Sequence, residues 1–267
     1  METYRLKNIA IVILLLLNGG LLLLLGYQYL QAKRTESETS RQLQALCEAH
    51  QLTLNSRVDL SQTPLSPLTL SRSNETEQAI ASWLLGSEAA SSSRGGGIYS
   101  YDVEGGSIQF RSGGSFDGSH LSLRVDDITD FSQRFCKQFG YQDVQVQVRN
   151  LTGSVTAMEQ VAGVPVYGCN VTMYFEDGLL TSVTGAHVGL EGAVVEAGRA
   201  MTCVTALVRF LDYRGTEGIV CSSVSDVQCV YTLQSTTSTL RLLPVWRIDT
   251  DTYTYFVDCS SGEITRA

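Results

Sequence analysis

One long apolar stretch, residues 9–25, limits what this chain can fold into more than any other part of the sequence. As a helix, its 17 residues reach about 26 Å. Continuing the helix through Tyr29 covers a hydrocarbon core of about 30 Å. A short tail with Arg5 and Lys7 precedes the stretch. We therefore expect residues 1–34 to form a cytoplasmic tail and a single transmembrane anchor.

A basic tail followed by an apolar core also describes a cleaved signal peptide. Here the apolar core is longer than usual and no A-x-A-like cleavage site follows it, so retention of the helix is favoured. Basic residues lie on both sides of the stretch and do not fix its orientation. Because so short a tail is easily kept in the cytoplasm, we expect a single-pass protein of the cell membrane. Its N-terminus would be cytoplasmic and its body extracytoplasmic.

The remaining body is acidic. The chain has a formal net charge of -8, and residues 35–267 hold 26 acidic and 15 basic side chains, which leaves -11 outside the anchor. Phosphate backbones would repel such a body, which argues against nucleic acid as a partner. Anionic lipid would repel it as well. The expected membrane contact is therefore the N-terminal helix alone.

Seven cysteines are spread along the body, and none forms a C-x-x-C pair, so their spacing matches no zinc or redox motif. Several lie within apolar patterns, where a thiol behaves as a small core hydrophobe. Buried free thiols are therefore favoured. The alternative is a disulfide between Cys221 and Cys229, or between Cys169 and Cys259, if the body faces an oxidising space.

Capping signals and apolar stripes predict four helices, over residues 39–50, 74–86, 127–140 and 195–214. The second helix starts at Asn74, with Glu77 three residues later as a capping-box partner. Asp127 caps the third, and glycines follow or end the last three. The first helix can simply continue the membrane helix outward as a stalk.

Between the helices the apolar period changes to two, which is typical of half-buried strands. The alternation predicts strands over residues 144–148, 167–175, 179–186 and 253–259, and another beginning at Trp246. Residues 98–123 are predicted to form a meander of short strands. The serine- and glycine-rich residues 87–97 are predicted to form a flexible loop.

Two parts of the sequence resemble each other. The segment from Val164-Pro165-Val166-Tyr167 to residue 181 parallels the segment from Leu243-Pro244-Val245-Trp246 to residue 265, and each follows a helix and an earlier strand. We therefore expect an α+β body in which a helix packed on an antiparallel meander is used at least twice. The expected divisions are a stalk helix with a first α+β region over residues 35–125, and a C-terminal α+β region with two repeats over residues 126–267.

No catalytic motif is present. The sequence lacks a nucleophile elbow, a phosphate-binding loop, the zinc motif H-E-x-x-H and a dinucleotide fingerprint. Its three histidines lie in three different predicted segments, where surface or core roles are expected. Asp249 and Asp251 could meet a cation, although a solvated turn is favoured. We therefore expect a binding or regulatory protein without enzymatic activity, cofactor or metal site.

The matched aromatic residues Tyr167 and Trp246 are candidate partner-facing residues, because each could present its ring to a peptide at a sheet edge. The favoured alternative is a repeated core position that holds a large ring in both copies.

Several of these features together resemble a known family. They are the basic tail, the single membrane helix ending near Leu25-Gly26-Tyr27-Gln28, the stalk, and the closing runs Leu243-Pro244-Val245-Trp246-Arg247-Ile248, Tyr255-Phe256-Val257-Asp258 and Ser261-Gly262-Glu263-Ile264. The chain resembles the YycH/YycI regulatory proteins of Gram-positive bacteria, and YycI more than YycH by its size. The proline-aromatic strand and the G-E-I turn are also shared with PepSY-like modules.

The resemblance implies a non-catalytic regulator of a sensor histidine kinase in a two-component system linked to cell-wall metabolism, with that kinase and a related accessory membrane protein as partners. Such a chain acts by binding states of its partner differently. Small residues let membrane helices approach closely, so Gly19 and Gly20, with Asn18 beside them, are the candidate helix contacts. The alternative function is a membrane-tethered PepSY-like module that binds or inhibits a secreted protease or a cell-wall ligand.

Overall fold

The computed structural model describes residue 18 and residues 38–87, 89–189, 193–196, 198, 200–235 and 239–267. The anchor expected over residues 9–25 lies outside this part, except for Asn18, which is helical and exposed. Among the described residues, no helix combines the length and the hydropathy needed to cross a bilayer.

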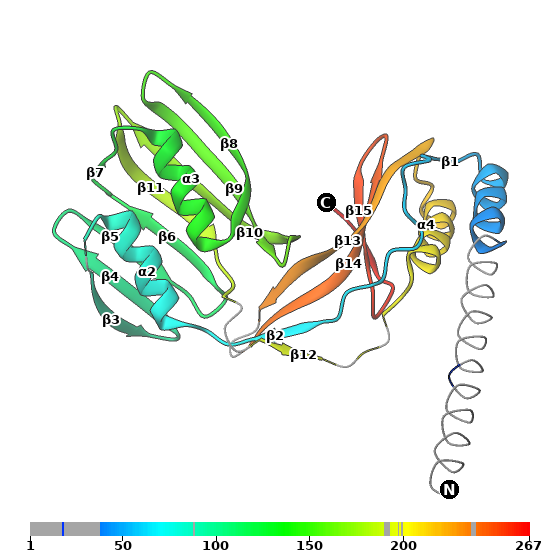
Figure 1. Ribbon diagram of the computed structural model, residues 1–267, viewed down its shortest axis with the longest axis horizontal. Helices are drawn as coiled ribbons and strands as arrows, with labels where there is room; N and C mark the ends of the chain where they lie inside the picture. Colours follow the sequence, from blue (N-terminus) through cyan, green and yellow to red (C-terminus); the bar gives the residue numbers. More distant parts are fainter. Residues whose placement is uncertain are drawn as a thin grey trace, which may run out of the picture.

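The α+β class is confirmed. The described part of the chain holds four helices, over residues 38–49, α2 (Asn74–Leu85), α3 (Ile128–Phe139) and α4 (Cys203–Glu217). The strands form one large mixed sheet, strongly bent, which gives the molecule two lobes (Figure 1).

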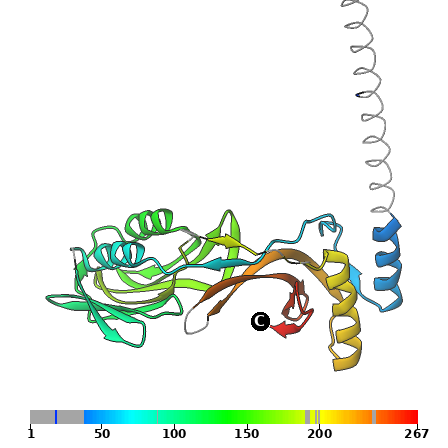
Figure 2. The same cartoon turned by 90° about the horizontal axis from the view of Figure 1, so that it is seen from below.

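The inserted lobe, residues 74–186, is continuous in sequence. It contains α2, α3 and the strands β3 (Ala90–Gly95), β4 (Ile98–Val103), β5 (Gly106–Phe110), β6 (Ser115–Ser119), β7 (Leu123–Arg124), β8 (Tyr141–Arg149), β9 (Thr152–Val161), β10 (Val164–Glu176) and β11 (Leu179–Ala186). Both helices lie on the same face of its sheet, and the other face is open (Figure 2). Their apolar sides share one core with the inward residues of β4 to β11.

The terminal lobe is made of two separate chain segments, residues 38–70 and residues 193–267. It contains the helix over residues 38–49, α4 and the strands β1 (Thr53–Leu54), β2 (Leu68–Leu70), β12 (Val194–Val195), β13 (Ser223–Ser235), β14 (Leu240–Thr250), β15 (Thr254–Asp258) and β16 (Ile264–Arg266). The first helix lies beside α4 (Figures 1 and 2), and Leu43 and Cys47 from it are buried in the core under α4.

Each of the last two helices precedes four strands that pair antiparallel in sequence order, β8 to β11 after α3 and β13 to β16 after α4. The division between lobes, however, does not follow the expected boundary between residues 125 and 126. Residues of α2 and α3 lie in the same core, so that boundary cuts through one packing unit. The boundary was predicted from the repeat in the sequence. That repeat reflects the pattern of the strands and does not show which helices share a core.

Two local predictions were also wrong. The last helix begins at Cys203, eight residues after the expected start, because Thr202 caps it and Val194–Val195 pairs with β2 instead. Gly215, which the prediction placed just beyond that helix, lies within it, and Gly218 is its left-handed C-cap. Much of the expected loop over residues 87–97 is β3, an exposed edge strand paired with β4.

Candidate functional site

The chain passes between the lobes at two places that lie side by side. It leaves the terminal lobe after β2, through residues 71–73, and after β11 it continues through residues 187–189 before β12. Val194 of β12 pairs with Thr69 of β2, so the outgoing and returning segments are neighbours. A third connection joins the sheets, because β10 pairs in parallel with β13 through Val166 and Tyr167. We call residues 71–73 and 187–189 with their contacts the junction.

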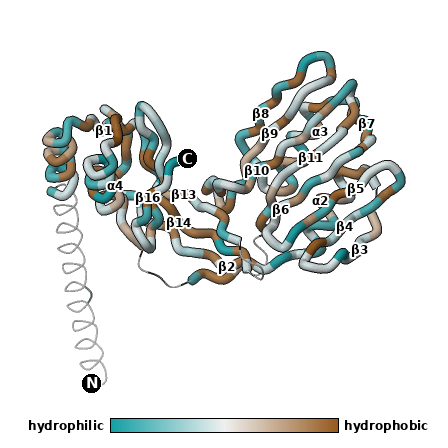
Figure 3. Tube along the Cα trace, turned by 180° about the vertical axis from the view of Figure 1, so that it is seen from behind, coloured by the Kyte–Doolittle hydropathy of each residue, from teal (hydrophilic) through white to brown (hydrophobic). Residues whose placement is uncertain are grey.

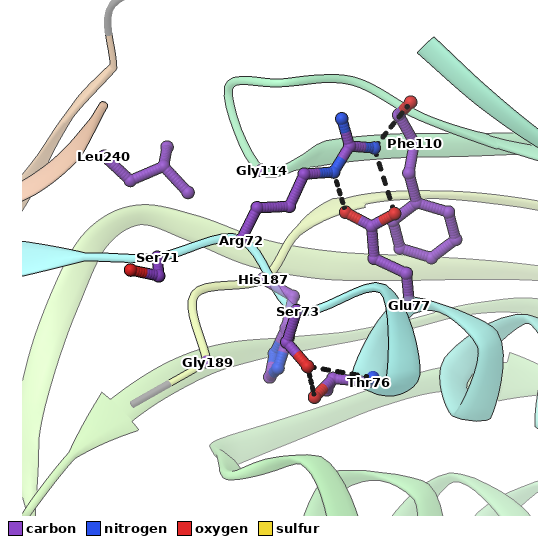
Figure 4. Close-up of a pocket in the computed structure, with 10 residues that line it drawn as sticks. All are labelled: Ser71, Arg72, Ser73, Thr76, Glu77, Phe110, Gly114, His187, Gly189 and Leu240. Carbon is purple, nitrogen blue, oxygen red and sulfur yellow. Dashed lines mark hydrogen bonds and ion pairs between the residues drawn. The ribbon is translucent and has the colours of Figure 1, made fainter. Parts of the chain in front are cut away.

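Arg72 holds the outgoing segment against the inserted lobe (Figure 4). Its Nε lies 2.6 Å from Oε1 of Glu77 and its Nη2 2.9 Å from Oε2, a bidentate pair. Nη2 also donates to the carbonyl of Phe110 at 3.3 Å, and the guanidinium lies 4.6 Å from the centre of the Tyr99 ring. Both partners of the ion pair are largely buried, with side chains 21% and 8% exposed. Removing either one would leave a poorly solvated charge.

Glu159 of β9 holds the returning segment. Its two carboxylate oxygens accept from the backbone N–H of Val188, at 3.0 and 3.2 Å. Nδ1 of His187 lies 3.2 Å from Oε1, an approach whose angle is not that of a hydrogen bond. Burial raises the pKa of Glu159, although contact with His187 and the bonds from Val188 oppose the shift. The hydroxyl of Tyr141 donates to the carbonyl of Ala186 at 2.8 Å, just before the same segment.

A matching contact holds the edge of the terminal lobe. Nε of Arg241 on β14 donates to Oε1 of Glu196 at 3.1 Å, and Thr69 of β2 donates to the same carboxylate. The hydrogen bond from Arg241 and then that from Thr69 lower the pKa of Glu196. A carboxylate therefore fixes each of these three places: Glu77 binds Arg72, Glu159 binds the N–H of Val188, and Glu196 binds Arg241 and Thr69.

A small cavity of about 20 Å³ lies where these segments meet. Residues from both crossings and from both lobes line it, among them Ser73, Thr76, His187 and Leu240 (Figure 4). This cavity is about large enough for one water molecule. Ser73 in its lining accepts from the N–H of Thr76 at 3.3 Å as the cap of α2, whereas the buried Nδ1 of His187 has no hydrogen-bond partner among the described residues. A more open hollow of about 240 Å³ lies against the same returning segment and is lined by Thr76, Glu159, His187 and Val188 among others.

Tyr167, one of the candidate partner-facing residues, makes the third contact between the lobes. Its hydroxyl accepts from Nη1 of Arg247 on β14 at 2.9 Å, and its ring packs at 4.8 Å, edge to face, against Phe256 of β15. Arg247 also pairs with Asp226 at 2.8 Å and Asp249 at 3.0 Å. Burial alone would lower the pKa of Arg247, but the Tyr167 hydroxyl and the two carboxylates raise it. Tyr167 is half-buried, and its ring is engaged within the chain.

Trp246, the second candidate, is fully buried in the core of the terminal lobe. Its Nε1 donates to the carbonyl of Met201 at 2.8 Å. The ring therefore does not face a partner, and the core interpretation applies. Of the three candidate membrane-helix residues, Asn18 is described and exposed, whereas Gly19 and Gly20 lie outside the described residues.

All seven cysteines are free thiols, six of them buried, so the buried-thiol interpretation is confirmed and neither proposed disulfide is formed. The described residues contain no group of three His, Cys, Asp or Glu side chains that could hold a metal ion. Asp249, considered above as a cation ligand, accepts from Thr254 at 2.8 Å and pairs with Arg247.

The junction residues could not be recognised in the sequence. Glu159 and His187 are 28 positions apart on different elements, and Arg247 lies 80 positions from Tyr167. Only Arg72 and Glu77 are close in sequence, five positions apart at the start of α2. The sequence pattern predicts Glu77 as a capping-box partner. In the structure it binds Arg72 instead.

No protein-family model and no curated protein matches this chain. Among solved structures, it is similar to an uncharacterised protein from Eubacterium rectale ATCC 33656, with 12% sequence identity and a TM-score of 0.46. The similarity covers 81% of this chain and 91% of that protein. A likeness this distant carries no conclusion about function.

Proposed function

We propose that this chain is a non-catalytic, membrane-anchored regulatory protein that modulates a sensor histidine kinase of a two-component system linked to cell-wall metabolism. The resemblance to YycH/YycI proteins is the reason for proposing a sensor histidine kinase as the partner. The junction, where Arg72 binds Glu77 and Glu159 binds the N–H of Val188, supports a role in which the chain acts by binding. Without chemistry of its own, such a chain changes its partner only through different affinities for the partner's states.

The observation that carries this proposal is the rigid connection between the N-terminal side of the body and the terminal lobe. The helix over residues 38–49 buries Leu43 and Cys47 to 2% and 1% exposure in the core shared with α4. Nη1 of Arg214 on α4 donates to the carbonyl of His50 at 2.7 Å, and β1 then pairs with β13. A displacement of the preceding segment would therefore move the terminal lobe as one body, because packed cores do not deform continuously.

Within the membrane, we assign partner contact to the segment around Asn18, Gly19 and Gly20. Two adjacent glycines remove side-chain bulk from one point of an otherwise leucine-rich helix. Close approach of backbones and a side-chain amide capable of hydrogen bonding are the two features that favour helix association in lipid. The accessory membrane protein that accompanies such kinases would pack against the same helix or against the kinase.

In-membrane crosslinking followed by pull-down tests the proposal. The intact chain is compared with a variant in which residues 9–25 are replaced by a leucine-alanine helix of the same length. Recovery of a histidine kinase with the native helix alone supports regulation through a contact in the bilayer. Recovery with both moves the contact to the extracytoplasmic body, and recovery with neither overturns the kinase proposal.

The second candidate function is a PepSY-like module that binds a secreted protease or a cell-wall ligand, with the helix as a tether only. One observation favours it: the sheet of the inserted lobe leaves a whole face uncovered by helices (Figure 2). Under this alternative, Gly19→Leu with Gly20→Leu leaves function unchanged. Tyr167 and Trp246 do not provide a test of this alternative, because both rings are engaged within the chain and their loss would disturb the fold.

A further inference from the structure

The open face of the inserted lobe carries rows of uncharged polar side chains that run across the strands. One row joins Gln145, Thr156, Thr172 and Thr184, each directly opposite the next on β8, β9, β10 and β11. A second row joins Gln147, Ser154, Tyr174 and Ser182 on the same four strands. Hydrophobic and hydrophilic residues alternate along these strands (Figure 3), and the hydrophobic ones face α3. Neighbouring side chains in a row therefore recur about 4.8 Å apart.

A hollow of about 190 Å³ lies on this face, where two irregular registers meet. The pairing of β8 with β9 shifts between Gln142 and Gln145, and that of β9 with β10 shifts between Pro165 and Asn170. Bulges bend a strand and re-aim its side chains. The lining consists of amide, hydroxyl and thioether side chains with one carboxylate and one alanine: Asp143, Gln145, Thr156, Ala157, Met158, Asn170 and Thr172.

The charges of the lining residues limit the classes of ligand that could bind in the hollow. Its lining holds no basic residue, so an anion finds no counter-charge there. Asp143 is its one acidic residue, and it accepts from Nε2 of Gln160 at 3.4 Å. An apolar peptide would need a contiguous hydrophobic patch, whereas these rows are hydroxyls and amides. The remaining chemistry is a neutral ligand with many hydrogen-bonding groups.

One exposed aromatic ring lies on the same face as the hollow. Tyr174 is 45% exposed and lies two positions after Thr172 on the same face of β10. Its ring is the largest side chain in either row. A pyranose presents C–H groups on its face and hydroxyls at its rim, so it can stack on such a ring while its hydroxyls bond to threonine and amide side chains.

We propose that this face, from the hollow between β8 and β10 to the ring of Tyr174, binds a neutral oligosaccharide. Thr156, Thr172 and Asn170 would hydrogen-bond the sugar hydroxyls, and Tyr174 would stack on a neighbouring sugar ring. The proposal concerns the inserted lobe alone and holds whether or not a kinase is the partner of the chain.

Methyl NMR of the full-length chain, solubilised in a detergent without a sugar headgroup, tests this directly. Met158 lines the hollow, whereas Met173 lies in the core behind the sheet and Met201 beside α4. The probes are maltotetraose, cellotetraose and the tetramer of N-acetylglucosamine. We expect at least one to shift the Met158 methyl resonance saturably, with Met173 and Met201 unmoved. A Met158 resonance that responds to none of the three overturns the proposal.

Variants on the same face separate stacking from hydrogen bonding. Tyr174→Ala should raise Kd about tenfold, whereas Tyr174→Phe, which keeps the ring, should leave it within about twofold. Thr156→Val with Thr172→Val should weaken binding about tenfold by removing two hydroxyls from otherwise similar side chains. Thr265→Val, an exposed strand position in the other lobe, is the matched control and should have no effect. Unchanged Met173 and Met201 resonances verify folding, and equal affinity in Tyr174→Ala and wild type contradicts the proposal.

Discussion

The inserted lobe packs its helices through aromatic rings, whereas the terminal lobe packs α4 mainly through aliphatic side chains and thiols. In the inserted lobe, the ring of Phe135 lies 4.8 Å from that of Phe139, 5.8 Å from that of Tyr141 and 6.5 Å from that of Trp83. In the terminal lobe, Leu207 and Cys203 fill comparable space beneath α4. The space between a helix and an antiparallel meander can thus be filled by aromatic rings or by aliphatic side chains and thiols, because total buried volume and hydrophobic pattern matter more than residue type.

Burial keeps the buried thiols of both lobes protonated, whereas a hydrogen bond with the Cys259 thiol lowers the pKa of the half-buried Cys229. Burial raises the pKa of Cys136 in the inserted lobe to about 11 and that of Cys203 in the terminal lobe to about 12, the latter with a small addition from Asp59. A protonated thiol is neither a nucleophile nor a metal ligand. The cysteines therefore behave in both cores as the small hydrophobic residues that their sequence pattern indicated.

The two lobes also differ in chain continuity. The inserted lobe is one segment of 113 residues, from 74 to 186, and its main core is made without the rest of the chain. The terminal lobe must bring together residues on either side of that insertion. With the inserted lobe unfolded, this closure costs about 4 kcal/mol by (3/2)RT ln n. Loop closure should therefore make the terminal lobe depend on the inserted lobe. The reverse dependence comes only from contacts between the lobes, such as the small cluster of Val166, Cys169 and Leu242, and should be weaker.

Removing a ring from the aromatic core should have the largest effect. Phe135 is fully buried, and Phe135→Ala leaves a cavity among three other rings. We expect the free energy of unfolding of the inserted lobe to fall by about 3–5 kcal/mol in urea denaturation. Tyr253→Ala is the control, since that ring is 52% exposed, and should change it by less than about 1 kcal/mol. Equal losses in the two variants would contradict the packing described.

Trp246→Phe tests the core of the terminal lobe. The substitution keeps an aromatic ring but removes the N–H that bonds to the carbonyl of Met201. A buried carbonyl without its donor, together with the lost ring volume, should lower stability by about 1–3 kcal/mol. Trp83→Phe provides the comparison, because Nε1 of Trp83 has no hydrogen-bond partner among the described residues. A smaller loss of stability for Trp246→Phe than for Trp83→Phe would show that the hydrogen bond to the carbonyl of Met201 does not stabilise the core.

Tyr167→Phe tests the contact that links the lobes through Arg247. The ring and its packing on Phe256 remain, and only the acceptor for the guanidinium is lost. Because Arg247 keeps Asp226 and Asp249, we expect a loss of about 1 kcal/mol in the free energy of unfolding of the terminal lobe. No loss in urea denaturation, with unchanged near-ultraviolet circular dichroism, would show that the hydroxyl does not join the lobes.

Glu159→Gln should have the smallest effect, visible as a change in pH dependence. The pKa of Glu159 is raised in the folded chain, so its contribution to stability is full below the ordinary pKa of a glutamate. That contribution is lost as the pH rises through the raised value. The stability of wild type relative to Glu159→Gln should therefore fall between the ordinary glutamate pKa and neutral pH. Urea denaturation at a series of pH values measures this difference in stability. A rise of the difference over the same pH interval would contradict a carboxylate whose pKa is set mainly by burial.

Local signals account for what the sequence could predict. Asp127 caps α3 by accepting from the N–H of Asp130 at 2.9 Å, and Gly140 ends it in the left-handed conformation, as expected. Strand β11 occupies exactly the range of alternation at residues 179–186. The start of α4, by contrast, depended on Val194–Val195 finding β2 more than 100 positions away. The junction could not be predicted because its pairs form only when distant segments meet.

The most direct measurement follows the two tryptophans separately. The chain has one tryptophan in each lobe, Trp83 and Trp246, so fluorine-labelled tryptophan gives one resonance for each lobe during urea unfolding. Phe210 is a fully buried residue of α4 and provides the terminal-lobe counterpart of Phe135. Phe135→Ala should lower the midpoints of both resonances, whereas Phe210→Ala should lower that of Trp246 more than that of Trp83. Equal shifts of both resonances in Phe210→Ala, or an unchanged Trp246 midpoint in Phe135→Ala, would contradict the dependence of the terminal lobe on the inserted one.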